Sequence, residues 1–219
     1  MTEEEIIESR KINSLLHFTT NRGIVGVLAS GELLSRHRLP QEKYLEYVLH
    51  VNAASRPEAA SHFDKSQNWL DYVNLSITEI NKRFLDVSKR WHNNADVWWG
   101  ILEFDAEVMT HDGVVFVTTN NGYNLCTRAA GPEGLEALFA SVVSRKPGWS
   151  VARRARPANL PTCEQAEVLY PKAVPVDFLR RIYVEEDDHH DQASGWLHEF
   201  GYEDIEVVLS PQKFLGMPN

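Results

Sequence analysis

The apolar residues of this chain fall into short runs whose periodicity changes along the sequence. Early in the chain they recur at helical spacing, as at Ile24, Val27 and Leu28. Later runs are β-branched and aromatic, as over 97–104 and 114–118, which is typical of strands. Helices that come early and strands that come late predict an α+β fold, not a regularly alternating parallel sheet.

Periodicity and capping residues also predict where single elements lie. Thr20 or Asn21 can cap the first helix, and Gly31 stands where its left-handed C-terminal residue is needed. Ser76 to Glu79 has the form of a capping box, which predicts a second helix directly after it. We also expect helices from Gly131 through Val142 and over 192–200, a strand or turn over 15–19, strands over 72–77, 166–169, 182–184 and 206–209, and irregular chain over 34–71 and between Val142 and 166.

Length and composition limit the class of protein. The chain has 219 residues without an internal repeat or a low-complexity linker, so we expect a single domain over residues 1–219. Its net charge of −9, from 31 acidic and 22 basic residues, argues against general binding to nucleic acids or anionic membranes. Cys126 and Cys163 match no zinc-site spacing and favour a reducing compartment. The acidic start and the lack of any apolar run near ~18 residues predict a cytoplasmic protein without a membrane span.

The charge is distributed unevenly, which changes the conclusion about nucleic acids. No acidic residue lies between Glu136 and Glu164, where a basic segment rich in Pro, Gly and Ser also carries an aromatic side chain that could stack on a base. Its candidate nucleic-acid-binding residues are Arg145, Lys146, Trp149, Arg153, Arg154 and Arg156. The alternative is an ordinary surface loop. Nine acidic residues and no Lys or Arg lie within 185–206, which predicts a solvated surface or a docking surface.

One short motif points to a particular chemistry. Gln165 and Glu167 lie two residues apart at the start of an expected strand, so their side chains should share one face of the sheet. When a nucleophile displaces nicotinamide from NAD, positive charge develops on the ribose. A fixed carboxylate that hydrogen-bonds a ribose hydroxyl stabilises that transition state, and the neighbouring amide could hold the acceptor. The alternative is that Glu167 is a solvated strand residue.

Five blocks of sequence, taken in order, resemble one known family. The blocks are His17–Thr19, Gly31–Ser35, Asp71–Leu75, Gly113–Asn120 and Gln165–Leu169, the last followed by Pro171 and Val174-Pro175. They are similar to those of the DarT-type ADP-ribosyltransferases, toxins that transfer ADP-ribose from NAD onto bases of nucleic acid, chiefly single-stranded DNA. The resemblance covers about residues 12–184. It implies an ADP-ribosyltransferase-like fold, in which a central split β-sheet forms a cleft with flanking helices.

The resemblance also implies roles for single residues, with NAD as co-substrate. The implied catalytic residues are Glu167, Gln165 and Arg56, and the implied NAD-binding residues are His17, Thr19, Gly31 and Ser76. The family uses an arginine before the Asp71 strand, and we assign it to Arg56, the one arginine between Arg38 and Asp71. The structural alternatives are a buried, hydrogen-bonded histidine at position 17 and a helix cap at Ser76.

Other patterns carry weaker implications. His189 and His190 point apart and lack an evident third ligand, so we expect no metal site. The aromatic residues Trp69, Trp91, Trp98 and Trp99 fall in or beside apolar runs and are expected in the core.

The chain also departs from the family pattern. Gly23-Ile24 stands where members often have Asn-Leu, Asn74 replaces a proline, and Ser76 to Thr78 lacks the usual aromatic strand end. These departures leave the modified base open, and also whether the acceptor is DNA, RNA or a protein side chain. A further alternative is an inactive binding module. Because such a toxin would poison its host, the resemblance implies a toxin–antitoxin or phage-defence setting with a neutralising partner, a macrodomain hydrolase or another antitoxin.

Overall fold

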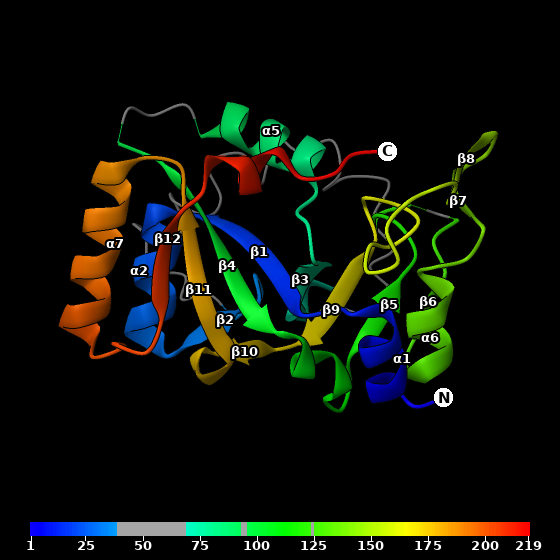
Figure 1. Cartoon of the computed structure of the whole chain (residues 1–219), viewed down its shortest axis with the longest axis horizontal. Coiled ribbons are helices and arrows are strands. Elements are labelled where there is room, and N and C mark those ends of the chain that lie inside the picture. The colour runs from blue at the N-terminus through cyan, green and yellow to red at the C-terminus, as the bar shows by residue number, and fades with distance from the viewer. Residues whose placement is uncertain (39–68, 93–95, 124) are drawn as a thin grey trace.

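The computed structural model describes residues 1–38, 69–92, 96–123 and 125–219, so Arg56 lies outside the described residues. The described chain forms an eight-stranded sheet in the order β12-β11-β4-β1-β3-β9-β5-β6. Strands β11 and β12 run parallel, and the other neighbours run antiparallel. Figure 1 shows α2 and α7 toward one end of this sheet and α1 and α6 toward the other. This architecture confirms the predicted α+β class.

The bounds of the elements are as follows. The large sheet contains β1 (Ser14–Thr20), β3 (Tyr72–Ile77), β4 (Trp99–Asp105), β5 (Val115–Val117), β6 (Arg128–Ala129), β9 (Glu167–Pro171), β11 (Leu179–Val184) and β12 (Glu206–Leu209). Two small sheets pair β2 (Glu32–Leu34) with β10 (Ala173–Pro175), and β7 (Val142–Lys146) with β8 (Trp149–Ala152). The helices are α1 (Glu3–Arg10), α2 (Asn21–Ser30), α5 (Lys82–Trp91), α6 (Gly131–Ala137) and α7 (Asp187–Phe200), with 3-10 turns η1 (Trp69–Asp71), η2 (Ala106–Thr110), η3 (Val176–Phe178) and η4 (Pro211–Leu215). None of these helices has the length and hydrophobicity that crossing a bilayer requires, and the cytoplasmic location stays a prediction.

Apolar side chains cover both faces of the central strands. β4 is buried at six of its seven positions, as expected for a strand whose two faces are both packed. On one face, Leu15 and Leu102 belong to the larger core, which includes residues of α1, α2, α6 and α7. On the other face, Leu16 and Ile101 pack with residues of α5 and η4. The alternation along β1 and β4 therefore divides the core between the two faces of the sheet.

Helix α2 begins and ends where the sequence predicts. The hydroxyl of Thr20 accepts a hydrogen bond from the Gly23 N–H at 3.3 Å, which caps the first turn. Gly31 ends the helix with a φ of 74°, in the left-handed region that favours glycine. The helix follows β1 without a connecting loop, so its first turn lies directly beyond the end of that strand.

The sheet opens between β1 and β3. Seven residue pairs join β1 to β4, but β1 pairs with β3 only at Leu15↔Ile77 and Leu16↔Ser76. Beyond Leu16 the two strands part, and the next residue of β1 is His17. This is the split in the central sheet that the family resemblance implies, and it brings the candidate residues of β1, β3 and β9 to one region.

Two expectations about local structure are wrong. Ser76 does not cap a helix, because it lies within β3 and pairs with Leu16. The N-cap of α5 is Asn81, whose side-chain oxygen accepts from the Phe84 N–H at 3.1 Å. The third expected helix ends at Ala137, and the polar segment after it forms the β7–β8 hairpin. Val142, expected on a buried helix face, therefore lies exposed in β7.

Candidate active site

Glu167 is the first residue of β9, in the middle of the large sheet. Its side chain is partly buried, and its Oε2 accepts two hydrogen bonds. One comes from Nδ2 of Asn74 in β3, and the other comes from the backbone N–H of Asn121, both at 3.0 Å. Because both bonds end on Oε2, the described residues leave Oε1 available to a ligand. Glu167 is thus a held carboxylate, not the solvated strand residue of the alternative hypothesis.

The surroundings of Glu167 make its carboxyl group unusually basic. Burial removes water from the charged form and raises the pKa from its ordinary 4.5 to about 7. The hydrogen bonds from Asn121 and Asn74 and the positive charge of Arg128 act in the opposite direction, but burial dominates. A carboxyl group with so high a pKa, held in an opening of the sheet, is typical of a functional site.

His17 and Asn74 connect the two sides of the split. The Nδ1 atom of His17 lies 2.9 Å from the backbone oxygen of Asn74. Since a carbonyl oxygen can only accept, Nδ1 carries the proton, and Nε2 of the neutral ring is an acceptor. Burial lowers the pKa of His17, so the ring is neutral at pH 7. Asn74 therefore contacts the histidine through its backbone and Glu167 through its side chain.

Thr19 of β1 pairs with Gly100 of β4, and its side chain lies against Gly23 in the first turn of α2. A Cβ atom added to Gly23 would lie 2.0 Å from Oγ1 of Thr19, far inside van der Waals contact. Glycine at position 23 therefore makes room for the threonine side chain.

The remaining predicted site residues have other local roles. Gln165 lies in a turn before β9 and not on the strand, so it does not share a sheet face with Glu167 by strand alternation. Ser76 is a partly buried ladder residue of β3. Gly31 is the C-cap of α2, and a Cβ atom there would meet the Tyr202 hydroxyl at 3.6 Å. The catalytic role of Arg56 and the ligand contacts of these three residues stay predictions.

The basic segment is largely structural, which corrects the prediction for Arg145. That side chain is 1% exposed. It donates to Asn219 and Cys163 and lies 3.6 Å from Oε1 of Glu164, so it does not reach nucleic acid. Arg153 donates to the backbone oxygens of Pro157, Ala158 and Leu160, and Arg156 donates to that of Pro161. These arginines stabilise the turn-rich segment that leads into β9.

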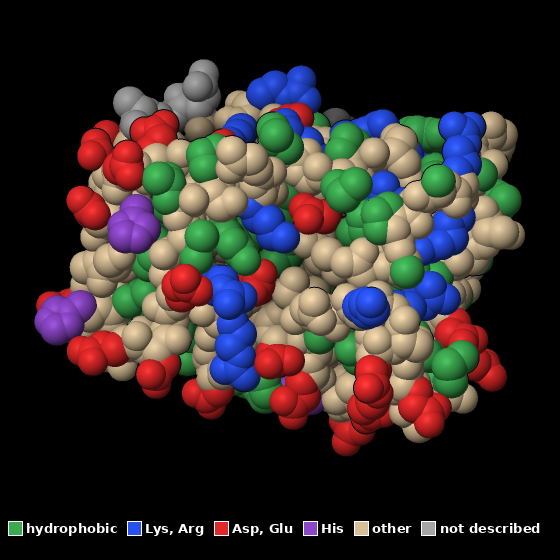
Figure 2. Space-filling view, in the orientation of Figure 1, with side chains coloured by type: hydrophobic (Ala, Val, Ile, Leu, Met, Phe, Trp, Pro, Cys, Tyr) green, Lys and Arg blue, Asp and Glu red, His purple; other side chains and the backbone are tan. Residues whose placement is uncertain are grey.

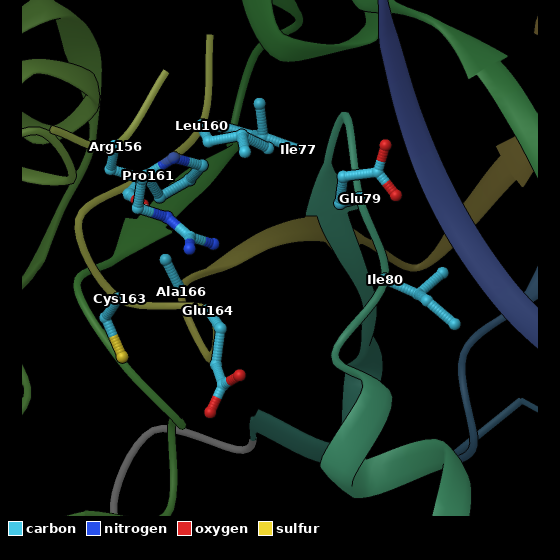
Figure 3. Close-up of a pocket in the computed structure, with 9 residues that line it drawn as sticks. All are labelled: Ile77, Glu79, Ile80, Arg156, Leu160, Pro161, Cys163, Glu164 and Ala166. Carbon is cyan, nitrogen blue, oxygen red and sulfur yellow. The ribbon is translucent and has the colours of Figure 1, made fainter. Parts of the chain in front are cut away.

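A small polar hollow lies beside this segment. It holds about 10 Å³, roughly the room of one water molecule. Figure 3 shows the Arg156 guanidinium directed into the hollow, between the segment before β9 and the end of β3. Its size suits one structural water and excludes NAD, so we interpret the hollow as part of the packing of the segment before β9 and not as a substrate site.

Three residues of the segment do lie at the surface. Lys146 and Arg154 are exposed, and Trp149 is 43% exposed. Lys146 and Trp149 belong to the β7–β8 hairpin. On the face shown in Figure 2, Lys and Arg side chains gather at the end of the molecule that carries this hairpin. Acidic side chains gather along the lower edge and the opposite end.

A second, larger hollow of about 680 Å³ lies near the start of α2. Trp98 lines it and stacks on the rings of His189 and Trp196, with centroid distances of 4.5 and 5.6 Å. Trp98 and Trp99 both line this hollow, but Trp98 is only partly buried, whereas Trp99 is 8% exposed and belongs to the smaller core cluster, as expected. Within the described chain, no three His, Cys, Asp or Glu side chains are grouped to hold a metal ion.

A comparison with known protein families shows to which family the chain belongs. The model of the family described as "ssDNA thymidine ADP-ribosyltransferase, DarT" matches residues 16–215, nearly the whole chain. The chain belongs to the DarT family. No curated protein matches this DarT-family chain by sequence.

Solved structures show the same fold at low sequence identity. Thermosipho africanus DarTG in complex with ADP-ribose has a TM-score of 0.63 and 15% identity, over 94% of this chain and 52% of that one. Our chain thus spans about half the length of the Thermosipho chain. Thermus sp. 2.9 DarT matches in complex with NAD+ (TM-score 0.61, 17% identity, 91% of this chain and 96% of that one) and with ADP-ribosylated ssDNA (0.64, 16%, 93% and 96%).

Two residues of the DarT-family site were missed by the sequence analysis. Asn121 donates to Glu167, and Arg128 of β6 donates to both oxygens of Asn121. Neither belongs to a recognisable motif. Asn121 directly follows the Gly113–Asn120 block, so the nearest signal was the end of a matching strand.

Proposed function

We propose that this chain transfers ADP-ribose from NAD⁺ to a base of single-stranded DNA and releases nicotinamide. The observation that carries the proposal is the Glu167 carboxylate, held through Oε2 at the split of the sheet with a pKa of about 7. The family description supports the reaction, and the bound NAD+ and ADP-ribosylated ssDNA of Thermus DarT support its substrates. Thymidine is the acceptor that the family description favours.

In the proposed reaction, Glu167 acts on the ribose next to nicotinamide. The bond from the anomeric carbon to nicotinamide breaks, and its electron pair leaves with nicotinamide. A nitrogen of the base forms a new bond to that carbon and releases its proton to water. Positive charge on the ribose peaks between these events, and an ionised Glu167 stabilises it while Oε1 accepts a hydrogen bond from a ribose hydroxyl. The positive charge of NAD⁺ itself favours the ionised carboxylate.

The opposite side of the split supplies acceptors and donors for the rest of NAD. Nε2 of His17 is an acceptor because the ring is neutral and its Nδ1–H is bound to Asn74. A ribose hydroxyl is a donor that matches it. The hydroxyl of Thr19 lies two residues further along the same strand, toward the first turn of α2. We therefore place NAD along β1, from Glu167 toward Thr19.

We propose that the DNA strand contacts the β7–β8 hairpin and Arg154, which lies two residues after the end of β8. Trp149 offers a ring on which a base can stack, and Lys146 and Arg154 offer charges for phosphates. Replacing either cation by Gln should lower the salt dependence of oligonucleotide binding by about 0.7 in the log–log slope, as expected for one lost phosphate contact on a single strand. An unchanged slope in both variants would mean that neither Lys146 nor Arg154 contacts the DNA.

A parallel acceptor screen tests the proposal. Labelled NAD⁺ is offered with single-stranded DNA of each base, with RNA and with protein extract. We expect label on DNA that contains thymidine. Label on protein instead would support the second candidate, a protein-modifying transferase, and NAD binding without any transfer would support an inactive binding module.

The biological setting is proposed from the family resemblance. A transferase that modifies DNA would harm its own cell, so we propose a toxin with a neutralising partner, a macrodomain hydrolase or another antitoxin. The DarTG name of the Thermosipho chain is consistent with a larger assembly. Loss of viable cells on expression, prevented by Glu167→Gln, would support this setting.

A further inference from the structure

Arg128 lies in register with Glu167, one strand apart. In β6, Arg128 pairs directly with Val117 of β5, and Val117 pairs directly with Glu167 of β9. Directly paired residues of antiparallel strands place their side chains on the same face. Arg128 and Glu167 therefore share a face, with backbones about 10 Å apart, at two strand spacings.

Asn121 bridges the gap between these two residues. Nε of Arg128 donates to Oδ1 of Asn121, and Nη2 donates to the backbone oxygen of the same residue. The Asn121 N–H then donates to Oε2 of Glu167 at 3.0 Å. Asn121 is 6% exposed, so water competes little for these bonds. The guanidinium itself lies 5.2 Å from the ring centroid of Trp69, which limits its movement.

We infer that Arg128 is a positioning residue for Glu167 and acts through Asn121. By binding both the side-chain oxygen and the backbone oxygen of Asn121, the guanidinium fixes the conformation of that residue, so that its N–H points at Oε2 and Oε1 stays available to substrate. The effect of this positioning on catalysis rests on the proposed function, whereas the positioning itself does not. A planar guanidinium binds two acceptors in fixed geometry, and a lysine ammonium cannot reproduce that.

Arg128 also supplies charge, which can be separated from its geometry. Among the described residues, Arg128 is the charged group that acts on Glu167 and lowers its pKa, against the larger effect of burial. The other described residues that hydrogen-bond or pair with Glu167 are uncharged, namely Asn74, Asn121 and Val117, and His17, which contacts Asn74, is neutral at pH 7. Substitution of Arg128 by Met removes both its positive charge and its two hydrogen bonds to Asn121. Substitution by Lys keeps the charge but not the planar group that makes both bonds.

The test is an NMR pH titration of the ligand-free protein. The Glu167 carboxyl carbon is assigned with Glu167→Gln, and the Asn121 amide is followed in the same samples. In the wild type we expect both signals to titrate together near pH 7. In Arg128→Met the carboxyl midpoint should rise by about 1 pH unit, as expected for loss of an opposite charge nearby, and the Asn121 amide should no longer follow it.

Two further variants make the titration decisive. In Arg128→Lys the midpoint of the Glu167 carboxyl titration should stay near the wild-type value, but the Asn121 amide signal should no longer change with it. If Arg128→Met does not fold, Arg128→Lys alone tests whether Arg128 positions Glu167. Arg180→Met is the matched control, because Arg180 is exposed and pairs with Asp105 at a different part of the sheet. An Asn121 amide that still titrates with Glu167 in Arg128→Lys would overturn the inference.

Enzyme kinetics provide the second readout. Both Arg128 variants should lower kcat on the order of 10- to 100-fold, as a displaced catalytic group does, with KM for NAD⁺ within about 2-fold. A raised KM with unchanged kcat would mean that Arg128 binds NAD⁺ directly, which contradicts a positioning role. If the wild type transfers nothing, the proposed function fails, but the titration still decides whether Arg128 positions Glu167.

Discussion

Replacing Glu167 by Gln should stabilise the fold while it removes activity. In the folded chain, burial raises the carboxyl pKa from 4.5 to about 7. Between these two pH values the folded state binds more protons than the unfolded state, so the free energy of unfolding falls as pH rises. Above about pH 7 the full cost of the buried charge is present. Gln has nearly the same shape and no charge, and its oxygen can accept the bonds from Asn74 and Asn121.

The size of this effect follows from the pKa difference. A rise of the pKa from 4.5 to about 7 corresponds to at most about 3.5 kcal/mol, at about 1.36 kcal/mol for each pKa unit. Because the Glu167 side chain retains some contact with solvent, we expect about 1–3 kcal/mol at pH 8. For a chain of this length that corresponds to a Tm increase of roughly 2–12 °C.

The assay is thermal unfolding of the wild type and Glu167→Gln at pH 5 and pH 8. The Tm difference should be small at pH 5 and should grow to its full size at pH 8. Glu103→Gln is the matched control of opposite sign. Glu103 is 8% exposed and accepts from Arg181 at 2.6 Å and from Tyr183 at 2.7 Å, so its loss should destabilise the fold. Equal or lower stability of Glu167→Gln at pH 8 would show that burial does not penalise the charge of Glu167.

Two further pairs of variants test packing around the site by thermal unfolding. Gly23→Ala should lower the free energy of unfolding by about 1–3 kcal/mol and weaken NAD⁺ binding, because the new Cβ overlaps Thr19. Gly26→Ala, with open space around it, should instead stabilise α2 by about 0.5–1 kcal/mol. Arg145→Ala should destabilise the fold by about 3–5 kcal/mol, because it removes a buried guanidinium that donates to Cys163 and Asn219, and it leaves the buried Glu164 carboxylate with the half-exposed Arg83 as its described ion-pair partner. Arg154→Ala, at an exposed position, should leave Tm unchanged and weaken DNA binding in a filter or anisotropy assay. If Gly26→Ala were less stable than Gly23→Ala, or Arg154→Ala less stable than Arg145→Ala, the packing described above would be contradicted.

Features set by nearby residues could be predicted from the sequence. Thr20 and Gly31 mark the two ends of α2 because capping depends on the residue itself and its immediate neighbours. The strand content and the α+β class followed from periodicity for the same reason. Ser76 shows the limit of such patterns, because pairing with Leu16, far away in sequence, holds it in a strand although its local pattern favours a helix cap.

Features set by distant residues could not be predicted. A run of basic residues indicates charge but not burial, and Arg145 is buried because Glu164 and Asn219 meet it in the fold. The support of Glu167 likewise depends on the register of three strands, which brings Arg128 and Asn121 together with it. Glu167 itself could be proposed from the sequence because its block resembles a family motif.

The most direct test of the account is mass spectrometry of single-stranded oligonucleotides of defined sequence after incubation with NAD⁺. The wild type should add one ADP-ribose to a base, and Glu107→Gln, at an exposed glutamate of η2, should do the same. Glu167→Gln should be folded and should lose the product by at least on the order of 1,000-fold, since it removes the charge that stabilises the transition state. Undiminished product from Glu167→Gln, or no modified oligonucleotide with the wild type, would contradict the assignment of Glu167 as the catalytic residue of a DNA ADP-ribosyltransferase.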